Sequence, residues 1–417
     1  MVHDDVEPDP GARPAVPPAV EPAAPPAVPP AVQPAVQPAA TPAVQPAARS
    51  AEARVDVLVA GCGPVGAVLA ARLGALGLSV LVVERDAQAY PLPRAVAADD
   101  EVQHLLSLID PGLLVGALPD VGVRFVGADR RPVGQLSFPT GPSGHSGLTL
   151  FHQPTLEERL RVIVARVAEL RLGVGLLSWT QDSTGVSAVL DDGSRVRAGW
   201  LVGCDGAGSQ VRRAAGIAWR GHDLARPWLV VDVTGQVDRP GLTYTCDPAG
   251  PQVDMPLPGG HRWEWLLRPG EPAPDPRPLL ARDVDPDEVQ VVRAVTYRYG
   301  ARRAERWQAG RVLLAGDAAH TMPPFAGQGL GAGVRDAWSL AALLTKGDPS
   351  GYQALRAPHV AAMTRLSLFL GAVVETRSPG LAAVRDTLLR SAFRSPRLGP
   401  WLGRGGPRST VSGVLHL

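Results

Sequence analysis

One short motif constrains this chain more than any other, the glycine-rich turn GCGPVG at residues 61–66. It follows the strongly apolar stretch VDVLVA, which is typical of a buried strand, and it opens a stretch typical of a helix. A second apolar strand pattern, LSVLVVER, comes next and contains Glu84 near its end. A strand, a glycine turn, a helix and a second parallel strand together form a unit that binds dinucleotides.

Each glycine of this turn has its own physical reason. Gly61 permits the tight turn, Gly63 lets a pyrophosphate approach the backbone, and Gly66 lets the helix pack closely on the strand. The N-terminus of the helix then faces the anion. Glu84 follows at about the 20-residue distance at which a carboxylate binds the ribose hydroxyls. The sequence therefore predicts a Rossmann-like core.

Two later turns place an aspartate beside glycines at the end of a predicted strand. The first is GCDGAGSQVRR at residues 203–213, which contains Asp205, and the second is GDAAHTMPPFAGQG at residues 316–329, which contains Asp317. Such an aspartate can accept hydrogen bonds from a polyol or from water bound to a pyrophosphate. Together with the glycine turn at residues 61–66, these two aspartate turns predict a long cofactor that is held from several directions.

The remaining chain predicts a mixed fold (α/β with α+β character) in two intertwined parts. Strands punctuated by Pro and Trp, such as WLVVDVTG and HRWEWLLRPG, alternate as in an antiparallel sheet with one covered face. We expect a Rossmann-like core, an inserted antiparallel sheet that binds the substrate, and C-terminal helices. The expected segments are a Pro/Ala-rich tail at 1–50, the core at 51–215 with some residues of the substrate sheet near 121–150, the substrate sheet at 216–306, the second part of the core at 307–345, and a C-terminal helical segment at 346–417 that is helical through Val374 and irregular beyond it.

Composition and charge exclude several classes of function. The formal net charge of +1 creates no field of one sign that would attract nucleic acid or an anionic membrane. We see no apolar run long enough to span a bilayer, and the N-terminus lacks the basic and apolar regions of a signal peptide. Three cysteines without a CxxC pair predict neither a disulfide framework nor a metal site. We therefore expect a cytoplasmic protein with a small-molecule partner and no metal.

Several other residues are interpreted as structural. The three cysteines are expected to be small buried residues. His320 is more typical of a buried histidine with a hydrogen-bond partner than of an acid or a base. Trp263 and Trp265 are alternate residues of one predicted strand, and we expect them to fill the space beside the sheet.

Three further segments carry a resemblance to a known family. Residues 90–101 (YPLPRAVAADDE), Cys246-Asp247-Pro248 and residues 301–320 (ARRAERWQAGRVLLAGDAAH) resemble the class A flavoprotein aromatic hydroxylases. The resemblance is greatest to the 3-(3-hydroxyphenyl)propionate hydroxylase branch, and it runs from about Val55 to Val374.

The resemblance implies roles for individual residues in binding FAD. The glycine turn would bind the pyrophosphate, Glu84 the adenosine ribose, Asp317 a ribityl hydroxyl, and the backbone after Pro324 would face the pyrimidine edge of the flavin. Asp205 would lie near both FAD and NAD(P)H. The complete set of implied cofactor-binding residues is Gly61, Gly63, Pro64, Gly66, Glu84, Arg85, Arg94, Gln153, Asp205, Gly316, Asp317, Pro324, Gly327, Gln328 and Gly329.

The same resemblance implies an enzyme, an FAD-dependent monooxygenase that hydroxylates a phenolic or other aromatic substrate. It would use NADH or NADPH and O2 through a flavin C4a-hydroperoxide, and no catalytic side chain is assigned because the cofactor carries out the chemistry. Two alternatives stay open: a flavin oxidoreductase of another reaction type, such as Baeyer–Villiger insertion or dehydrogenation, and a degenerate FAD-binding protein without activity. The oligomeric state is also open, with a homodimer as one alternative.

The sequence departs from the family pattern in two places. The family reads Gly-Gln-Gly-x-Asn-x-Gly, and Gly331 stands at the position of the Asn. This difference predicts a missing contact near the flavin, so that Gly331→Asn would raise the affinity for FAD. Arg356-Ala357-Pro358 stands where the family usually has Glu-Arg-Arg.

The tail generates the first testable prediction. Deleting residues 1–50 should leave the FAD content and the melting temperature unchanged, because repeated prolines withhold backbone donors and the segment contributes no core. Flavin absorbance and a thermal melt of the shortened chain measure both quantities. A large loss of either one would show that the tail packs on the rest of the protein.

Overall fold

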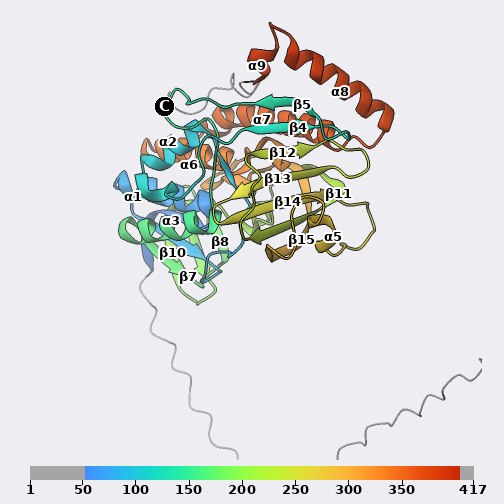
Figure 1. The fold of residues 1–417 in the computed structure, drawn as a ribbon. Coiled ribbons are helices and arrows are strands. Elements are labelled where there is room, and N and C mark those ends of the chain that lie inside the picture. Colours follow the sequence, from blue (N-terminus) through green and yellow to red (C-terminus); the bar gives the residue numbers. More distant parts are fainter. Residues whose placement is uncertain (1–51, 404–417) are drawn as a thin grey trace, which may run out of the picture. The chain divides into compact units, whose positions relative to one another are not determined.

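The structure is a computed structural model that describes residues 52–403. The predicted Pro/Ala-rich tail at 1–50 and residues 404–417 lie outside the described residues. Within them lie two eight-stranded β-sheets and a small two-stranded sheet, and Figure 1 shows helices packed around the two large sheets. The mixed fold that the sequence predicts is confirmed.

The first sheet is built from short, apolar and largely parallel strands. β1 (Ala53–Ala60) lies at its centre between β10 (Arg195–Gly203) and β2 (Val80–Glu84), and both neighbours run parallel to it. Residues 57–59 of β1 are completely buried, as expected for a central strand of this type. The other strands of this sheet are β7 (Glu169–Leu172), β8 (Leu176–Gln181), β9 (Val186–Leu190), β16 (Gln308–Ala309) and β17 (Val312–Leu314).

The second sheet contains eight strands, and its neighbours are antiparallel except for the parallel pair β4–β12. Its strands come from distant parts of the chain, which agrees with an inserted sheet, although the exact domain boundaries stay a prediction. In spatial order the strands are β18 (His320–Thr321), β15 (Gln290–Ala304), β11 (Trp219–Thr234), β14 (Gly260–Leu266), β13 (Gln252–Leu257), β12 (Leu242–Thr245), β4 (Val123–Val126) and β5 (Pro132–Leu136).

The alternation of side chains divides the second sheet into two faces. On β14, Trp263 and Trp265 pack in an apolar cluster on the outer face and are 0% and 4% exposed, so their predicted structural role is confirmed. Arg262 and Glu264 are their alternate neighbours and point to the inner face. The inner face is the one that lines the cavity described below.

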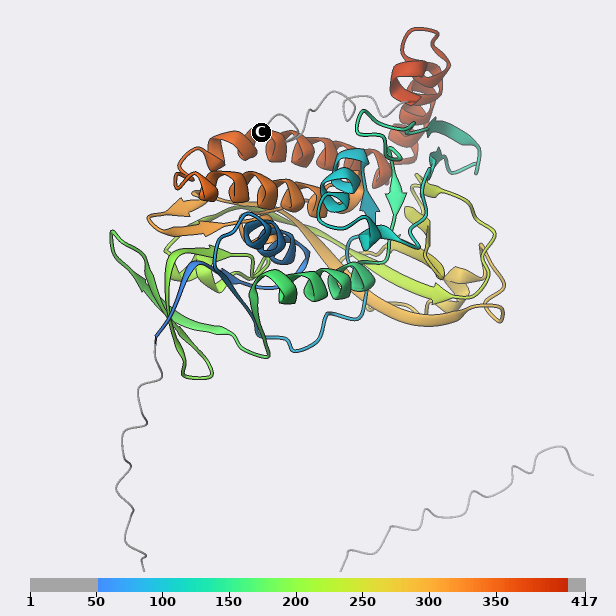
Figure 2. The same cartoon turned by 90° about the vertical axis from the view of Figure 1, so that its left-hand side faces the viewer.

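The main helices surround the first sheet and cover the inner face of the second. α1 (Pro64–Ala75) packs against α3 (Gln153–Val167) and α6 (Gly329–Thr345), and Figure 2 shows α6 beside α7 (Tyr352–Val374). The smaller elements are β3 (Ala97–Ala98), α2 (Asp100–Ser107), η1 (Pro111–Leu114), β6 (Thr149–Leu150), α4 (Gln210–Ala214), α5 (Arg277–Leu280), η2 (Gly316–Ala318), η3 (Pro324–Ala326) and α9 (Gly399–Gly403).

The expectation of an irregular chain beyond Val374 is wrong. Residues Pro379–Arg394 form the helix α8. Ser378 accepts a hydrogen bond from Leu381 N at this helix start, and Pro379 occupies the first turn. A serine followed by a proline is a helix-start signal that the sequence contained and that the prediction overlooked.

Helix α7 is the one helix in residues 52–403 that is long and apolar enough to cross a membrane by length and composition alone. It also contains buried polar groups, since Arg356 is 2% exposed and bonded to Asp336 while Ser367 is 0% exposed and bonded to Pro323 O. Polar contacts of this kind within the protein are typical of a helix that packs in a protein core.

The three cysteines are free, so no disulfide joins any two of them. Cys62 and Cys246 are 0% exposed, and burial raises the pKa of each thiol to about 12. Thiols held neutral in this way are poor nucleophiles and poor metal ligands. The predicted role as small buried residues is confirmed for these two, and Cys204 is partly buried.

Gly331 lies in the first turn of α6 and faces a buried ion-pair network. Arg335 donates hydrogen bonds to Glu101 Oε2 and, at 2.8 Å, to Asp99 Oδ1. A Cβ atom on residue 331 would lie 2.9 Å from Arg335 Nη1 and 3.1 Å from Val102 Cγ2. The glycine therefore makes room for Arg335, which is a different reason from the weakened flavin contact that the family pattern predicts.

We now expect Gly331→Asn to destabilise the protein by about 1–3 kcal/mol, because the new side chain must displace Arg335 or Val102. Thermal or denaturant unfolding measures the change. Gly380→Asn is the matched control, since Gly380 also lies in the first turn of a helix but has open space around an added Cβ. An unchanged or raised stability of Gly331→Asn would contradict this view of the glycine.

Candidate functional site

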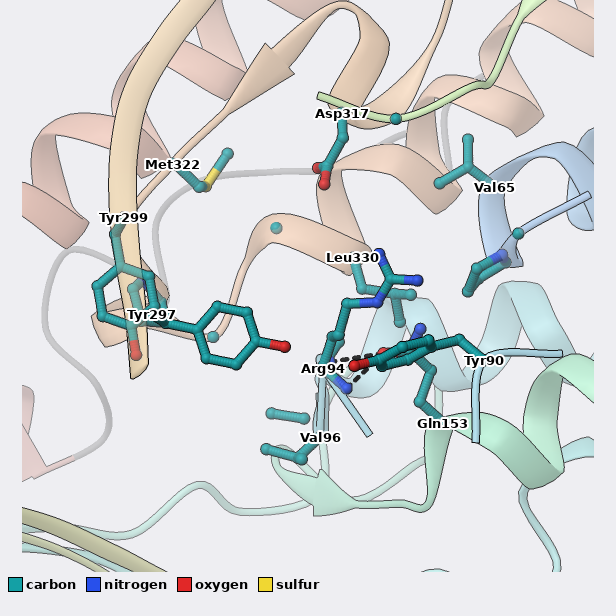
Figure 3. A pocket seen from close by; sticks show the side chains of 18 of the residues that line it. Val65, Tyr90, Arg94, Val96, Gln153, Tyr297, Tyr299, Asp317, Met322 and Leu330 are labelled. Atoms are coloured by element: carbon teal, nitrogen blue, oxygen red, sulfur yellow. Dashed lines mark hydrogen bonds between the residues drawn. The ribbon is translucent and has the colours of Figure 1, made fainter. Parts of the chain in front are cut away.

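A cavity of about 890 Å³ opens at the carboxyl ends of the strands of the first sheet. Residues that directly follow β1, β2, β10 and β17 line one end of it, and the inner face of the second sheet lines the other. Ligands of open α/β sheets bind at this edge of the sheet. Figure 3 shows part of the cavity, with side chains from both halves of the fold pointing into it.

The glycine turn is shaped by close backbone contacts. Gly61 has a φ of 103°, and a Cβ atom there would lie 2.5 Å from Cys204 O in the second turn. A Cβ atom on Gly66 would lie 2.0 Å from Gly61 O, so the helix α1 can approach the strand only because this residue is glycine. Nothing lies within 4 Å of an added Cβ on Gly63, which lines the cavity. The turn forms an open cradle of the kind that a pyrophosphate requires.

Glu84 holds the same turn from the neighbouring strand. Its Oε2 accepts a hydrogen bond from Cys62 N at 2.7 Å, and its Oε1 accepts one from Asp86 N at 3.0 Å. Each carboxylate oxygen can accept a further hydrogen bond, and Glu84 lines the cavity. Arg85 follows it at the exposed edge of the cavity, 3.8 Å from Asp86 in an exposed ion pair.

Asp205 divides its two oxygens between the fold and the cavity. Its Oδ2 accepts hydrogen bonds from Gln210 N at 2.7 Å and Val211 N at 3.0 Å, which caps the start of α4. Its Oδ1 is buried and has no partner in residues 52–403. A buried carboxylate oxygen without a donor is costly. A ligand hydroxyl or an ordered water in the cavity would satisfy it.

Asp317 and Arg94 point into the cavity from different elements (Figure 3). Asp317 is exposed to the cavity, although protein surrounds it on the other sides. Desolvation raises the pKa of its carboxyl, and the nearby charges of His320 and Arg94 only partly oppose this rise. The guanidinium of Arg94 lies 4.5 Å from the ring centre of Tyr90. The pair places one anionic acceptor and one cationic donor between the glycine turn and the second sheet.

Gln153 positions the backbone beside Arg94. Its Oε1 accepts hydrogen bonds from Arg94 N at 3.1 Å and Ala95 N at 2.6 Å, and its Nε2 donates to Glu157. The family resemblance implies that Gln153 lies along the cofactor, and Gln153 does line the cavity. Its side-chain oxygen is nevertheless used within the protein.

A buried carboxylate behind Asp317 was not predicted from the sequence. Asp336 Oδ2 lies 2.6 Å from His320 Nε2 and accepts a hydrogen bond from Gly316 N at 3.2 Å, while its Oδ1 accepts one from Arg356 Nε at 3.0 Å. Burial acts to raise the pKa of Asp336, but His320 and Arg356 outweigh it and lower the pKa. The predicted role of His320 as a buried, bonded histidine is confirmed.

The segment before α6 is anchored on both sides. Tyr244 Oη donates to Phe325 O at 2.7 Å, and Ser367 Oγ donates to Pro323 O. Gln328 turns its side chain away from the cavity and donates to Asp99 Oδ2 at 3.1 Å. The backbone of this segment therefore faces the cavity at the start of α6, where a helix has its positive dipole end.

Most of the predicted cofactor-binding residues come together at the cavity. Those that line it are Gly61, Gly63, Pro64, Glu84, Arg85, Arg94, Gln153, Asp205, Asp317, Pro324, Gly327 and Gly329. Gly66, Gly316 and Gln328 lie behind the lining and shape it. Whether each residue contacts a cofactor stays a prediction.

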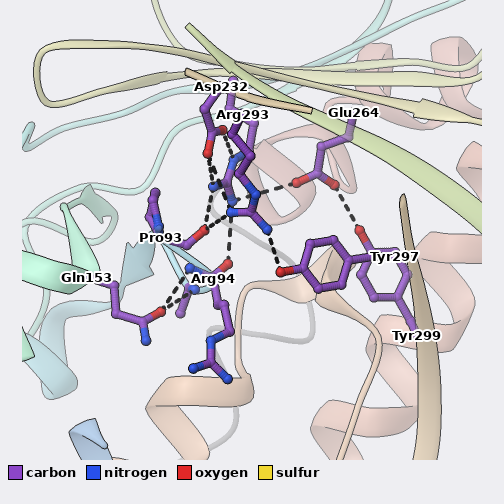
Figure 4. A network of polar contacts seen from close by, with 10 residues as sticks. Pro93, Arg94, Gln153, Asp232, Glu264, Arg293, Tyr297 and Tyr299 are labelled. Carbon is purple, nitrogen blue, oxygen red and sulfur yellow. Dashed lines mark hydrogen bonds and ion pairs between the residues drawn. The ribbon is translucent and has the colours of Figure 1, made fainter. Parts of the chain in front are cut away.

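A second polar network lies on the inner face of the second sheet (Figure 4). Arg262 forms two hydrogen bonds with Asp232, at 2.6 Å and 2.9 Å, and Arg293 lies 3.5 Å from the same carboxylate. Both arginines donate to Pro93 O at 2.6 Å, which ties the sheet to the segment that carries Arg94. This network was not predicted from the sequence, although the period-two pattern of polar residues on β14 and β15 was a visible signal.

The chemistry of these groups fits a bound dinucleotide. The open glycine cradle at Gly63, the unpartnered oxygen of Asp205 and the opposed charges of Arg94 and Asp317 supply the contacts that a pyrophosphate and a polyol require. The sequence also matches the family described as FAD binding domain over residues 54–272 and 273–367. The chain belongs to this FAD-binding family.

Two curated relatives illustrate the similarity to known proteins. The 3-(3-hydroxy-phenyl)propionate/3-hydroxycinnamic acid hydroxylase of Klebsiella pneumoniae subsp. pneumoniae is 36% identical over 359 residues, which cover 80% of this chain and 64% of that relative. The protein of the same name from Comamonas testosteroni is 35% identical over 397 residues, covering 88% of this chain and 67% of the relative. The chain thus spans about two thirds of the length of these relatives, and slightly less for the first.

Solved structures share the fold. Aklavinone-11 hydroxylase in complex with FAD and aklavinone has a TM-score of 0.68 at 29% identity, covering 80% of this chain and 71% of that one. The p-nitrophenol 4-monooxygenase PnpA from Pseudomonas putida DLL-E4 has a TM-score of 0.77 at 22% identity, covering 86% of this chain and 98% of that one. The second comparison shows similarity of fold alone.

Asp317 provides a test of the cofactor site. Asp317→Ala should lower the affinity for FAD about 10- to 100-fold, because a hydrogen bond to a charged group is worth about 1.5–3 kcal/mol. The ratio of flavin to protein after desalting measures the loss. Asp348→Ala is the control, since Asp348 is exposed and lies away from the cavity. Full retention of flavin by Asp317→Ala would show that the ribityl contact is placed wrongly.

Proposed function

We propose that this protein is an FAD-dependent monooxygenase that hydroxylates an aromatic, phenolic substrate with NAD(P)H and O2. The observation that carries the proposal is the continuity of the cavity. One space joins the dinucleotide cradle at Gly63 to an apolar chamber lined by Tyr244, Met255 and Phe325. A flavin ring that extends from the cradle would therefore meet an apolar substrate without leaving the protein. The names of the hydroxylase relatives support the same reaction.

Bound FAD would supply the redox chemistry, taking electrons from NAD(P)H and activating O2. The glycine turn, Asp205, Arg94 and Asp317 would hold its phosphates and hydroxyls. The start of α6, with Gly327 and Gly329 lining the cavity, would place a positive dipole end beside the flavin and stabilise negative charge on it.

The second sheet and helices α7 and α8 would orient the substrate. Their contribution is an apolar enclosure that excludes water from the reacting groups, with side chains such as Phe325 and Leu370 in the wall. Phe325 is fixed for this task, because the rings of Trp228 and Tyr299 meet it edge-on with centroid distances of 5.6 Å and 6.3 Å. A rigid wall holds the ring of the substrate in one orientation.

The remaining features of the proposal follow from the fold and the composition. We place the protein in the cytoplasm, with a small aromatic compound and O2 as its partners. No group of three or more metal-binding side chains comes together in residues 52–403.

The proposal is tested with the purified, FAD-loaded protein. A panel of phenols should accelerate the oxidation of NADH or NADPH, followed by absorbance, and comparison of the two nucleotides shows which is used. The product should gain one oxygen atom on an intact ring, measured by mass spectrometry. Oxygen insertion into the ring or simple dehydrogenation would favour another flavin reaction. Bound FAD with no response to any phenol would favour the protein without activity.

A further inference from the structure

The part of the cavity between the inner face of the second sheet and helices α7 and α8 is called the substrate chamber here. Its walls are apolar, with Phe125, Leu242, Met255, Leu370 and Phe393 as examples. Among the described residues, the cationic side chains that line the cavity elsewhere belong to its cofactor end, where Arg94 lies beside Asp317 and Arg213 beside Gly208. Of the cationic side chains in residues 52–403, Arg262 and Arg293 are the two that line the chamber itself.

Both arginines form ion pairs with Asp232, although Arg293 Nε is buried without a hydrogen-bond partner among residues 52–403. Arg262 binds both oxygens of Asp232 and also Pro93 O, and its side chain is 3% exposed. Arg293 donates to Pro93 O and to Tyr297 Oη, and its side chain is 2% exposed. With Asp232 and Glu264 as the two neighbouring acids, the cluster is balanced in charge. Among the described residues, a carboxylate on the substrate would find no cation beside it that lacks an ion-pair partner.

Glu264 is the charged residue of this cluster that can still accept a hydrogen bond from a ligand. Its Oε2 accepts a hydrogen bond from Tyr299 Oη at 3.2 Å, while its Oε1 lies 3.9 Å from Arg262 Nη1, beyond hydrogen-bond distance. No residue in the described range donates a hydrogen bond to this Oε1. Glu264 lines the chamber and its side chain is 12% exposed, so this oxygen, which is ion-paired with Arg262 but accepts no hydrogen bond from the described residues, is accessible from the chamber.

We propose that the chamber binds an uncharged, hydroxylated aromatic compound whose hydroxyl group donates a hydrogen bond to Glu264 Oε1. This inference rests on the proposed function, because it names the substrate class of the same site. Tyr299 and Arg262 hold the carboxylate in place, and the apolar walls contact the rings. The hydrogen bond also polarises the O–H bond, which increases the electron density of the ring that is to be hydroxylated.

The preference for an uncharged compound has an electrostatic reason. A second carboxylate in the chamber would be desolvated and would lie near Glu264 and Asp232, and like charges in a low-dielectric space repel strongly. An amide of the same shape avoids both effects. The curated relatives are named for carboxylic acids, so the inference separates this chain from them.

Three ligands of matched shape test the substrate class with the FAD-loaded protein. They are 3-(3-hydroxyphenyl)propionate, its primary amide, and the methyl ether of that amide, which lacks the donating hydroxyl. The amide should stimulate NAD(P)H oxidation with a kcat/KM at least about tenfold above that of the acid, and it should bind at least about tenfold more tightly than the ether. Binding is followed by the perturbation of the flavin absorbance.

Each other outcome decides against the inference. A preference for the acid over the amide would overturn it and leave the proposed function standing. Equal binding of the amide and the ether would overturn the role of Glu264. Naphthol, a phenol without a carboxylate or an amide, serves as a fourth compound. If neither the three matched ligands nor naphthol stimulate NAD(P)H oxidation, the proposed function fails and the inference fails with it.

Variants test the residue. Glu264→Gln should lower kcat/KM for the amide about 10- to 100-fold and abolish the preference for hydroxyl over ether, with the FAD content unchanged. Tyr299→Phe should reduce the same preference to a smaller extent. Glu375→Gln is the matched control, because Glu375 accepts a hydrogen bond from Trp228 and lies outside the lining of the cavity. A preserved preference in Glu264→Gln would overturn the assignment.

A pH profile adds a readout that a structural role would not produce. The pKa of Glu264 is raised, mainly because the carboxyl is desolvated, and the negative charge of Asp232 raises it further. The charges of Arg262 and Arg293 and the hydrogen bond from Tyr299 lower the pKa but do not cancel the rise. The charged acceptor is present above this raised pKa, so binding of the amide should weaken as the pH falls through it. Glu264→Gln should lose this acid limb, and an unchanged limb in that variant would contradict the proposal.

Discussion

The fully buried carboxylate of Asp336 is the contact on which both halves of the cavity depend. It joins Gly316 N, His320 and Arg356, which belong to the second aspartate turn, the strand β18 and the helix α7. Asp336 itself lies on α6, whose first turn faces the cavity. Breaking a buried ion pair leaves an uncompensated charge and is strongly destabilising. The turn that carries Asp317 and the helix that covers the substrate chamber are therefore held by one group.

A comparable tie links the two sheets through the backbone of Pro93. Arg262 on β14 and Arg293 on β15 donate to Pro93 O, and Gln153 on α3 fixes the next two backbone N–H groups. The strands that form the substrate chamber thereby position the segment that carries Arg94 at the cofactor end. The cavity is continuous because the same polar contacts shape both of its ends, and this continuity supports the proposal of an oxygenation reaction at their junction.

Sequence reasoning succeeded best where local geometry restricts the residue type. Gly61 and Gly66 are glycines because a Cβ atom would collide with backbone atoms, and that requirement is readable from the spacing alone. It was least successful where several segments contribute one contact. Gln328 looked like a cofactor residue by its place in the motif, but its side chain turns toward Asp99, more than two hundred positions away in the chain. The helix-start signal before α8 was present and was overlooked.

The sequence by itself determined the dinucleotide-binding turn, the two aspartate turns, the mixed fold and the family resemblance, because each depends on residues that are close together in the chain. Only the tertiary structure decided which charges neutralise one another. Arg262 and Glu264 lie on β14 and Arg293 lies on β15, on either side of β11, which carries Asp232. Their balance depends on this strand order and on which face each side chain occupies. Gly331 shows the same limit, since its neighbour Arg335 is placed by ion pairs with residues of α2 and its N-cap. Electrostatic interactions depend on distance in space and on desolvation, and neither can be read from separation along the chain.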